Sequence, residues 1–286
     1  LPSYEDLVVA GEEVQERKLK EGYVPASHLL SVADFKVALA GSKPLLVREG
    51  RNIRLEAIAD PQDIIKKIYG GWARTVTLSA TVSAELIEAM LGEEVTLLRA
   101  GWPYGENLRV WMVRGLTTRY EARDEKLVED IRWVVGLIVK SGKRALVFLP
   151  SFDMLEAVRR EDVLYEDRGL PQESVDRLVS EFLNSEKPLV AVYNGRLSEG
   201  IDLSSDLVFL VGVPFAPPTP RTAKLLRRLS EIFGGDENRA KLHGIILPGL
   251  WAALQAAGRA IRGPEDSADI FLIDDRYRPL ARFLPR

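Results

Sequence analysis

Two arginines near the end of the sequence, Arg259 and Arg262, have the side-chain type and spacing of a phosphate-binding pair. They belong to the stretch 255–263 (QAAGRAIRG), and on a helix the i, i+4, i+7 spacing would place Gln255, Arg259 and Arg262 on one face. Arginine stays charged and offers forked donors that match phosphate oxygens, while Gly258 would let a backbone or ligand approach that face. The same spacing also fits a solvated basic helix end, with both arginines paired to Glu265, Asp266 or Asp274.

A second polar stretch, 194–202 (NGRLSEGID), follows a short apolar run. Its two glycines permit backbone conformations that other residues resist. Ser198, Glu199 and Asp202 could hydrogen-bond a ribose, a phosphate-bound water or the opposing arginines. Taken alone, the stretch fits a polar turn as well as it fits a ligand-binding loop.

Three further stretches have weaker chemical signatures. Ser79 and Thr81 follow an apolar run, and hydroxyls in that position commonly cap the next helix. Ser151 is similar as a helix start, although the Phe152 ring beside it could stack on a base. The stretch 214–220 (PFAPPTP) is a rigid, extended loop with one aromatic ring, which fits a single-strand contact or a stiff connector.

Short apolar strands that alternate with helices must position these residues. Fully apolar strands of this length are typical of a parallel sheet buried on both faces, so the sequence predicts βα units. Functional residues should then lie in loops at the carboxyl ends of the strands. The predicted strands are 76–78, 107–113, 145–149, 163–166, 189–192, 207–211 and 270–273, and the predicted helices are 4–21, 26–40, 61–69, 83–91, 124–140, 151–160, 173–184, 221–233 and 248–261, with a hairpin at 45–58.

The composition excludes several classes of site. The 286 residues include no cysteine, so disulfides, thiol catalysis and cysteine-ligated metal sites are excluded within them. His28 and His243 lack a metal-ligand spacing, so no metal site is expected. No apolar run approaches the roughly 20 residues that span a bilayer, and no membrane association is expected. The formal net charge of −3 leaves nucleic-acid binding to a local basic surface.

In their order along the chain, these stretches resemble the motifs of superfamily 2 helicases, specifically the XPD (xeroderma pigmentosum D) helicases and their bacterial DinG relatives. The closest similarity is to archaeal members. Residues 79–81 (SAT) resemble motif III, 145–152 (ALVFLPSF) motif IV, 195–202 (GRLSEGID) motif V and 255–263 motif VI. The similarity extends over about residues 54–277.

The resemblance implies a RecA-like, doubly wound parallel sheet of the P-loop NTPase type. Residues 105–286 would form the second motor domain, and residues 1–104 the C-terminal part of the first motor domain with helices near the arch junction. The whole protein would be an ATP-dependent helicase that moves 5′ to 3′ on single-stranded DNA, with ATP and Mg²⁺ between its two motor domains.

The resemblance also assigns roles to residues. Arg259 and Arg262 would meet the γ-phosphate as arginine fingers, and Gln255 would position neighbouring groups. Glu199, Gly200 and Asp202, with Gly258, would contact the nucleotide side and couple it to domain closure. Ser79 and Thr81 would take part in coupling. Single-stranded DNA would touch Ser151, Phe152, Asn194, Arg196, Pro217, Pro218 and Thr219.

The departures from the family pattern are equally informative. The sequence has no Gly-x-x-x-x-Gly-Lys-Ser/Thr loop, no Asp-Glu-Ala-His box and none of the four cysteines that hold the family's iron–sulfur cluster. These elements lie upstream of motif III, so we expect them in a remaining N-terminal half, which would be the partner of this chain. The chain alone should not hydrolyse ATP. The alternatives are a catalytically inactive DNA-binding or regulatory module, or a DinG-like translocase. The expected location is the nucleoid in a prokaryote or the nucleus in a eukaryote.

Overall fold

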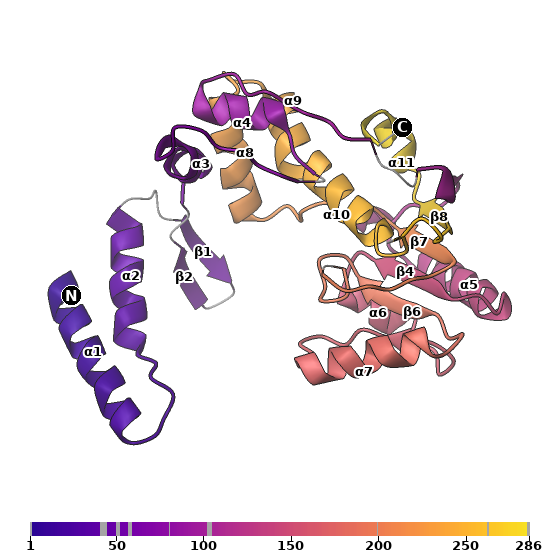
Figure 1. Cartoon of the computed structure of the whole chain (residues 1–286), viewed down its shortest axis with the longest axis horizontal. Coiled ribbons are helices and arrows are strands. Elements are labelled where there is room, and N and C mark those ends of the chain that lie inside the picture. The colour runs from indigo at the N-terminus through magenta and orange to yellow at the C-terminus, as the bar shows by residue number, and fades with distance from the viewer. Residues whose placement is uncertain are drawn as a thin grey trace. The chain divides into compact units, whose positions relative to one another are not determined.

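The computed structural model describes residues 2–40, 45–49, 52–56, 59–79, 81–101, 105–198, 200–261 and 263–284 (Figure 1). Its contacts divide the chain into two compact units. The first contains Leu1–Leu97 and Pro217–Ala240, and the second contains Leu98–Ala216 and Lys241–Arg286. The motor-domain boundary expected after residue 104 stays a prediction. No sequence pattern indicated that residues 217–240 pack with the amino-terminal part of the chain.

The second unit is built on a six-stranded parallel sheet. Apolar side chains on both sides of each central strand make burial on two faces the favourable arrangement. The spatial order is β3-β8-β7-β4-β6-β5, and the pairing places Phe148 opposite Leu210, which in turn lies opposite Leu272. The strands are β3 (Leu108–Val113), β4 (Ala145–Leu149), β5 (Leu164–Tyr165), β6 (Leu189–Val192), β7 (Leu207–Val211) and β8 (Ala268–Ile273).

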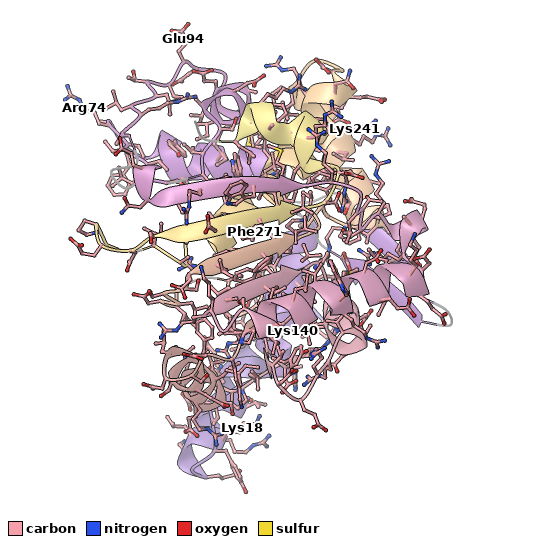
Figure 2. All side chains as sticks on the ribbon, turned by 90° about the vertical axis from the view of Figure 1, so that its right-hand side faces the viewer. Lys18, Arg74, Glu94, Lys140, Lys241 and Phe271 are labelled. Carbon is pink, nitrogen blue, oxygen red and sulfur yellow. The ribbon has the colours of Figure 1, made fainter. Side chains whose placement is uncertain are left out.

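Helices cover both faces of this sheet. On one face, α5 (Glu125–Lys140) and α6 (Phe152–Ala157) pack on alternate strand residues such as Val147 and Phe209. On the other face, α7 (Gln172–Leu183) and α10 (Leu247–Ala257) pack on the intervening residues, such as Phe148 and Leu210. Figure 2 shows α5, which carries Lys140, running alongside the strands of the sheet, and it labels Phe271 on β8. The predicted doubly wound α/β arrangement is therefore confirmed.

The first unit begins with two helices and a hairpin. Helix α1 (Tyr4–Lys20) starts at a capping box in which Ser3 and Asp6 exchange hydrogen bonds. It packs on α2 (His28–Ala40), and a Cβ added at Gly11 would lie 2.7 Å from Cγ of Leu30, so the glycine permits this close approach. Strands β1 (Leu45–Glu49) and β2 (Asn52–Glu56) pair antiparallel, as the predicted hairpin requires.

Residues 217–240 join this unit through a helix. Helix α8 (Pro220–Ile232) contributes Leu229 to a cluster with Met90 on α4 (Ala84–Leu91), and Phe233 lies in the same cluster. Arg228 on α8 pairs with Asp60, the N-cap of α3 (Pro61–Gly70), at 2.6 Å. The helix thus rests on an apolar cluster with ion pairs beside it.

The predicted buried strand at 76–78 is wrong. The side chains of Val76 and Leu78 are 85% and 91% exposed, and the structure assigns no strand to this stretch. A strand requires a hydrogen-bonded neighbour, and within the described residues no strand pairs with 76–78. An apolar run predicts a buried strand only where such a neighbour is present.

The predicted helix 248–261 has different ends in the structure. Helix α9 (Glu237–Lys241), a π-helical turn (Leu242–Ile246) and α10 follow one another. Pro248 has no N–H to donate to the carbonyl of Gly244, four residues earlier. A wider π-helical turn before Pro248 accommodates the missing hydrogen bond. The carboxyl end of the helix falls at Ala257. Among the described helices, none has the length and apolar character needed to cross a bilayer.

Candidate functional site at the carboxyl edge of the sheet

The loops that follow four central strands meet at one edge of the second unit. Strands β4, β6, β7 and β8 are parallel, so their carboxyl ends point the same way. The residues that follow them are Pro150, Tyr193, Gly212 and Asp274. In open parallel sheets this edge is where ligands bind, so we call it the carboxyl edge.

Arg259 contacts the loop that the sequence singled out. Its Nε donates to the carbonyl oxygen of Ser198 at 3.0 Å, and one terminal nitrogen donates to that of Ile201 at 3.5 Å. Gly200, between them, has a φ of 72° in the left-handed region, and a Cβ added there would meet nothing within 4 Å. The described structure therefore brings Arg259 to an open glycine turn. Glu199 and Arg262 lie outside the described residues.

The helix predicted to carry Gln255, Arg259 and Arg262 on one face ends before Arg259, and Arg262 lies outside the described residues. Helix α10 ends at Ala257 with Gly258 as its C-cap. Beyond it the N–H of Arg259 donates to Ala256 and that of Ala260 to Ala257, which are i−3 bonds of a tight turn. Gln255 is half-buried in the last turn of the helix, whereas Arg259 lies beyond it.

Gly258 is the C-cap of α10, with a φ of −64° in the right-handed helical region. A Cβ added at Gly258 would meet only the carbonyl oxygens of Leu254 and Gln255, at 3.5 and 3.6 Å. These are ordinary contacts, so no described neighbour approaches closely. The residue ends the helix, as glycine commonly does, and its predicted contact with a nucleotide stays a prediction. Asp202, also predicted on the nucleotide side, is exposed.

The turn after β6 is held by a residue that sequence reasoning missed. Glu166 is 1% exposed, and its carboxylate accepts the N–H groups of Val192 at 3.1 Å and Arg196 at 2.7 Å. Burial raises its pKa, although the backbone hydrogen bonds act in the opposite direction. Its position at the end of an apolar strand placed it at the carboxyl edge of the sheet, but gave no sign that it would be buried.

A second buried network joins the start of the unit to its last strand. Asp274 accepts the N–H and the hydroxyl of Thr118 at 2.8 and 3.0 Å, and its other contacts come from Arg276, at 2.7–2.9 Å. Burial opposes ionisation of Asp274, but the bonds from Arg276 and Thr118 outweigh it and hold the pKa below its ordinary value. The sequence placed Asp274 and Arg276 downstream of motif VI without predicting this network.

Gly212 lies at the centre of this edge. Its φ is 76°, and a Cβ there would lie 2.3 Å from the Thr118 hydroxyl and 2.7 Å from Cγ of Pro150. Its carbonyl accepts the hydroxyls of Tyr277 at 2.8 Å and Tyr193 at 3.2 Å. Burial raises the pKa of both tyrosines, so both stay protonated donors. Only glycine fits a position with this φ and these neighbours.

The residues predicted to touch DNA fall in two places. Ser151 and Phe152 follow β4, and Asn194 and Arg196 follow β6, so neighbouring strands bring the two pairs to the same edge. Pro217, Pro218 and Thr219 belong to the first unit and are exposed, where the Thr219 hydroxyl caps α8.

Several of these side chains already have protein partners. The Ser151 hydroxyl caps α6 by accepting the N–H of Met154 at 3.3 Å. The Arg168 guanidinium lies over the half-buried Phe152 ring, 5.0 Å from its centre. Arg196 donates to the carbonyl of Leu170 and to the Gln172 side chain. A DNA strand would have to share or replace these contacts.

Ser79 and Thr81 form a closed local turn in the first unit. The N–H of Thr81 donates to the Ser79 hydroxyl at 3.1 Å, and that hydroxyl donates to the Thr81 carbonyl, also at 3.1 Å. The cap of α4 is Ser83, as predicted. The coupling role of Ser79 and Thr81 stays a prediction.

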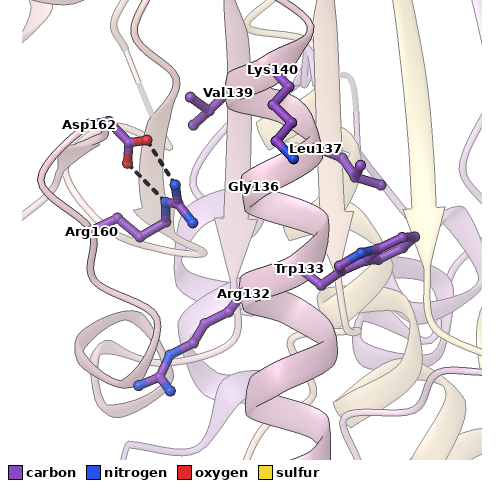
Figure 3. A pocket seen from close by; sticks show the side chains of 8 residues that line it. All are labelled: Arg132, Trp133, Gly136, Leu137, Val139, Lys140, Arg160 and Asp162. Carbon is purple, nitrogen blue, oxygen red and sulfur yellow. Dashed lines mark hydrogen bonds and ion pairs between the residues drawn. The ribbon is translucent and has the colours of Figure 1, made fainter.

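The structure also has a groove on the outer face of α5, away from the carboxyl edge (Figure 3). Its volume is about 290 Å³. Arg160 and Asp162, which pair at 2.8 Å, precede β5, and Lys140 precedes β4, so the groove lies towards the amino ends of the strands. Over the described part of the chain, no group of three His, Cys, Asp or Glu side chains is arranged to hold a metal ion.

Comparisons with known proteins agree with this architecture. The helicase C-terminal domain family matches residues 134–284. The ATP-dependent DNA helicase XPD of Sulfolobus acidocaldarius is 24% identical over 301 residues, which cover 94% of this chain and 51% of that protein. The ATP-dependent DNA helicase CHL1 of Kluyveromyces lactis is 26% identical over 324 residues, covering 97% of this chain and 38% of that protein.

Solved structures support the fold. The structure of an XPD helicase superposes with a TM-score of 0.74 at 21% identity, over 97% of this chain and 52% of that one. A second XPD structure, without ligand, gives 0.71 at 21% identity, over 97% and 59%. The RecA-like fold and the predicted resemblance to XPD helicases are confirmed, and the chain spans about half the length of the Sulfolobus relative. Because the family match covers more than half of the 286 residues, the chain belongs to the helicase C-terminal domain family.

Proposed function

We propose that this chain is the second motor domain of an ATP-dependent DNA helicase, preceded by the last part of the first motor domain. The observation that carries the proposal is the hydrogen bonding of Arg259 to the backbone carbonyls of Ser198 and Ile201, in a member of a helicase family. A guanidinium that the protein holds in a fixed position suits a phosphate group.

Arg259 stabilises charge on the γ-phosphate of ATP in this proposal. Phosphoryl transfer is accelerated mainly by positioning and by cations around the transferring oxygens. The carbonyls of Ser198 and Ile201 orient the guanidinium beforehand, and Arg262 acts as a second finger. Gln255 positions the neighbouring groups, and Glu199, Gly200, Asp202 and Gly258 line the nucleotide side and couple it to domain closure.

The remaining chemistry comes from the rest of the helicase. The phosphate loop and the carboxylate that holds Mg²⁺ belong to the other motor half, because the sequence contains neither motif. An iron–sulfur cluster likewise requires cysteines that these 286 residues do not have. Ser79 and Thr81 connect the two halves of the motor.

Single-stranded DNA crosses the carboxyl edge and is moved 5′ to 3′. Ser151, Phe152, Asn194 and Arg196 contact it there, and Pro217, Pro218 and Thr219 add an exposed surface on the first unit. Such contacts act through the backbone and through stacking, so binding should not depend on base sequence.

The test compares the complete helicase with this chain alone. The complete protein should hydrolyse ATP faster when single-stranded DNA is added, whereas the chain alone should show no turnover. The chain should bind single-stranded DNA weakly, with log affinity falling against log salt by about 0.7 per phosphate contact, and Phe152→Ala should weaken binding further. Turnover by the chain alone, or binding indifferent to both salt and Phe152, contradicts the proposal. An inactive complete protein would favour the binding-module alternative.

A further inference from the structure

The buried carboxylate of Glu166 and the turn after β6 form one structural device. We propose that Glu166 is a positioning residue that fixes the 193–198 turn, so that Asn194 and Arg196 are presented to single-stranded DNA. This inference rests on the proposed function, because it takes DNA as the ligand of those two residues.

The hydrogen bonds of Glu166 all go to backbone groups of that region. One oxygen accepts the N–H of Arg196 at 2.7 Å, and the other accepts the N–H of Val192 at 3.1 Å. The carboxylate is 26 to 30 residues away in sequence from the groups that it binds. At the end of β6, where strand pairing stops, the Glu166 carboxylate therefore accepts backbone N–H groups that a neighbouring strand would otherwise bind.

Gly195 shows how closely the turn is fitted around this carboxylate. A Cβ added at Gly195 would lie 2.5 and 2.6 Å from the two oxygens of Glu166. The φ of Gly195 is outside the left-handed region, so other residues could adopt this backbone. Glycine is needed here because the carboxylate of Glu166 occupies the space that a side chain would fill.

The fixed turn holds its exposed residues in an unusual conformation. Asn194 has a φ of 58°, the only positive φ among the described non-glycine residues, and such a conformation is unfavourable for a residue with a side chain. Its side chain is exposed. The N–H of Tyr193 donates to the Leu149 carbonyl at 3.1 Å, which ties the turn to the loop that begins at Pro150. The bonds of Glu166 offset the cost of Asn194 and keep its side chain outward.

The first test uses Glu166→Gln in the complete helicase, with Asp167→Asn as the matched control on the neighbouring exposed carboxylate. Glutamine keeps the size of the side chain but turns an NH2 group towards a backbone N–H. The DNA concentration that half-maximally stimulates ATP hydrolysis should rise roughly tenfold, while turnover without DNA changes little. Asp167→Asn should leave both unchanged. An unchanged DNA response in Glu166→Gln, or an equal loss of turnover with and without DNA, overturns the inference.

A second pair of variants keeps the inference testable where Glu166→Gln does not fold. Gly195→Ala should raise the required DNA concentration, because its Cβ displaces the carboxylate. Adding Glu166→Asp, which shortens the side chain by one CH2 group, should restore part of the response. Defects that add instead of compensating would overturn the inference.

A third measurement separates this inference from the proposed function. Amide hydrogen exchange at Val192 and Arg196, whose N–H groups bind the carboxylate, should be faster in Glu166→Gln than in Asp167→Asn. If DNA does not stimulate ATP hydrolysis by the unmodified complete protein, the proposed helicase function is refuted, while this exchange difference would still support the role of Glu166 in fixing the turn. Equal exchange rates in the two variants would refute that role of Glu166 and leave the proposed function intact.

Discussion

Two regions of the molecule join segments more than 150 residues apart through hydrogen-bond networks that contain an arginine–carboxylate pair, and they do so differently. At the carboxyl edge of the second unit, Asp274 binds Thr118 and Arg276, with side-chain exposures of 0% for Asp274 and 14% for Arg276. In the first unit, Arg228 of α8 binds Asp60, with exposures of 31% and 28%. Coulomb attraction strengthens as water is excluded. The stability of the Asp274 network in the second unit therefore depends on its charges, whereas the packing of α8 in the first unit depends on the apolar cluster beside Arg228 and Asp60.

The largest effect should follow loss of the buried charge. Asp274→Asn leaves Arg276 without its carboxylate and should lower the free energy of unfolding by about 3–5 kcal/mol. Asp275→Asn is the control, because Asp275 is exposed and only accepts the N–H of Gly115 at 2.9 Å. Urea unfolding of both variants measures the difference. If Asp274→Asn and Asp275→Asn lower the free energy of unfolding by similar small amounts, the Asp274 network contributes little to stability.

The same carboxylate gives a pH dependence with a defined sign. The folded-state pKa of Asp274 lies below its ordinary value, so its contribution to stability is complete above the unfolded pKa of about 3.9 and is lost as pH falls through the folded value. The stability gap between the native protein and Asp274→Asn should therefore be constant near neutral pH and shrink in acid. A gap that widens on acidification would contradict the assigned hydrogen bonds.

In the first unit the apolar cluster should dominate. Leu229 is 2% exposed within the cluster that holds α8, and Leu229→Ala should cost about 2–4 kcal/mol through lost burial and a cavity. Leu225→Ala, one turn earlier on the same helix and 38% exposed, should cost well under half of that. If Leu229→Ala and Leu225→Ala lower the free energy of unfolding equally, the apolar cluster is not the main interaction that holds α8 in place.

The smallest effect should come from the partly exposed ion pair between Arg228 and Asp60. Arg228→Ala should lower stability by about 0–1 kcal/mol, and less at high salt, because water and ions screen the pair. Arg227→Ala, at an 86% exposed neighbour, is the control. A loss of several kcal/mol at Arg228 would remove the contrast between the two regions.

The strands of the second unit could be predicted because each carries its own signal. The runs at 145–149, 189–192 and 207–211 are apolar without alternation, and β4, β6 and β7 have those bounds. The helix starts at Ser83 and Asp124 could also be predicted from local sequence, because each capping side chain accepts the backbone N–H of the residue three positions later. The similar apolar run at 76–78 led to a wrong prediction of a strand. The residues on either side of this run do not indicate whether another strand lies beside it in space.

The site could be predicted only in outline. Spacing pointed to Arg259, but the predicted helix ends before it, with Gly258 as its C-cap. Nothing local distinguishes Glu166 from an exposed glutamate, since its burial depends on a turn some 30 residues later. The docking of α8 on α3 and α4 brings together residues such as Arg228 and Asp60, 168 residues apart. Contacts across such separations leave no pattern in a single sequence.

The central claim is that Arg259 acts on the nucleotide, whereas the α8 contacts only hold the fold. The measurement that tests it most directly is ATP turnover and melting temperature of Arg259→Ala in the complete helicase, beside Arg228→Ala. Arg259→Ala should lower turnover by roughly 10³-fold, about 4 kcal/mol of barrier, with nearly the native melting temperature and with DNA binding retained. Arg228→Ala should keep turnover and lose a little stability. Near-normal turnover in Arg259→Ala would contradict the account.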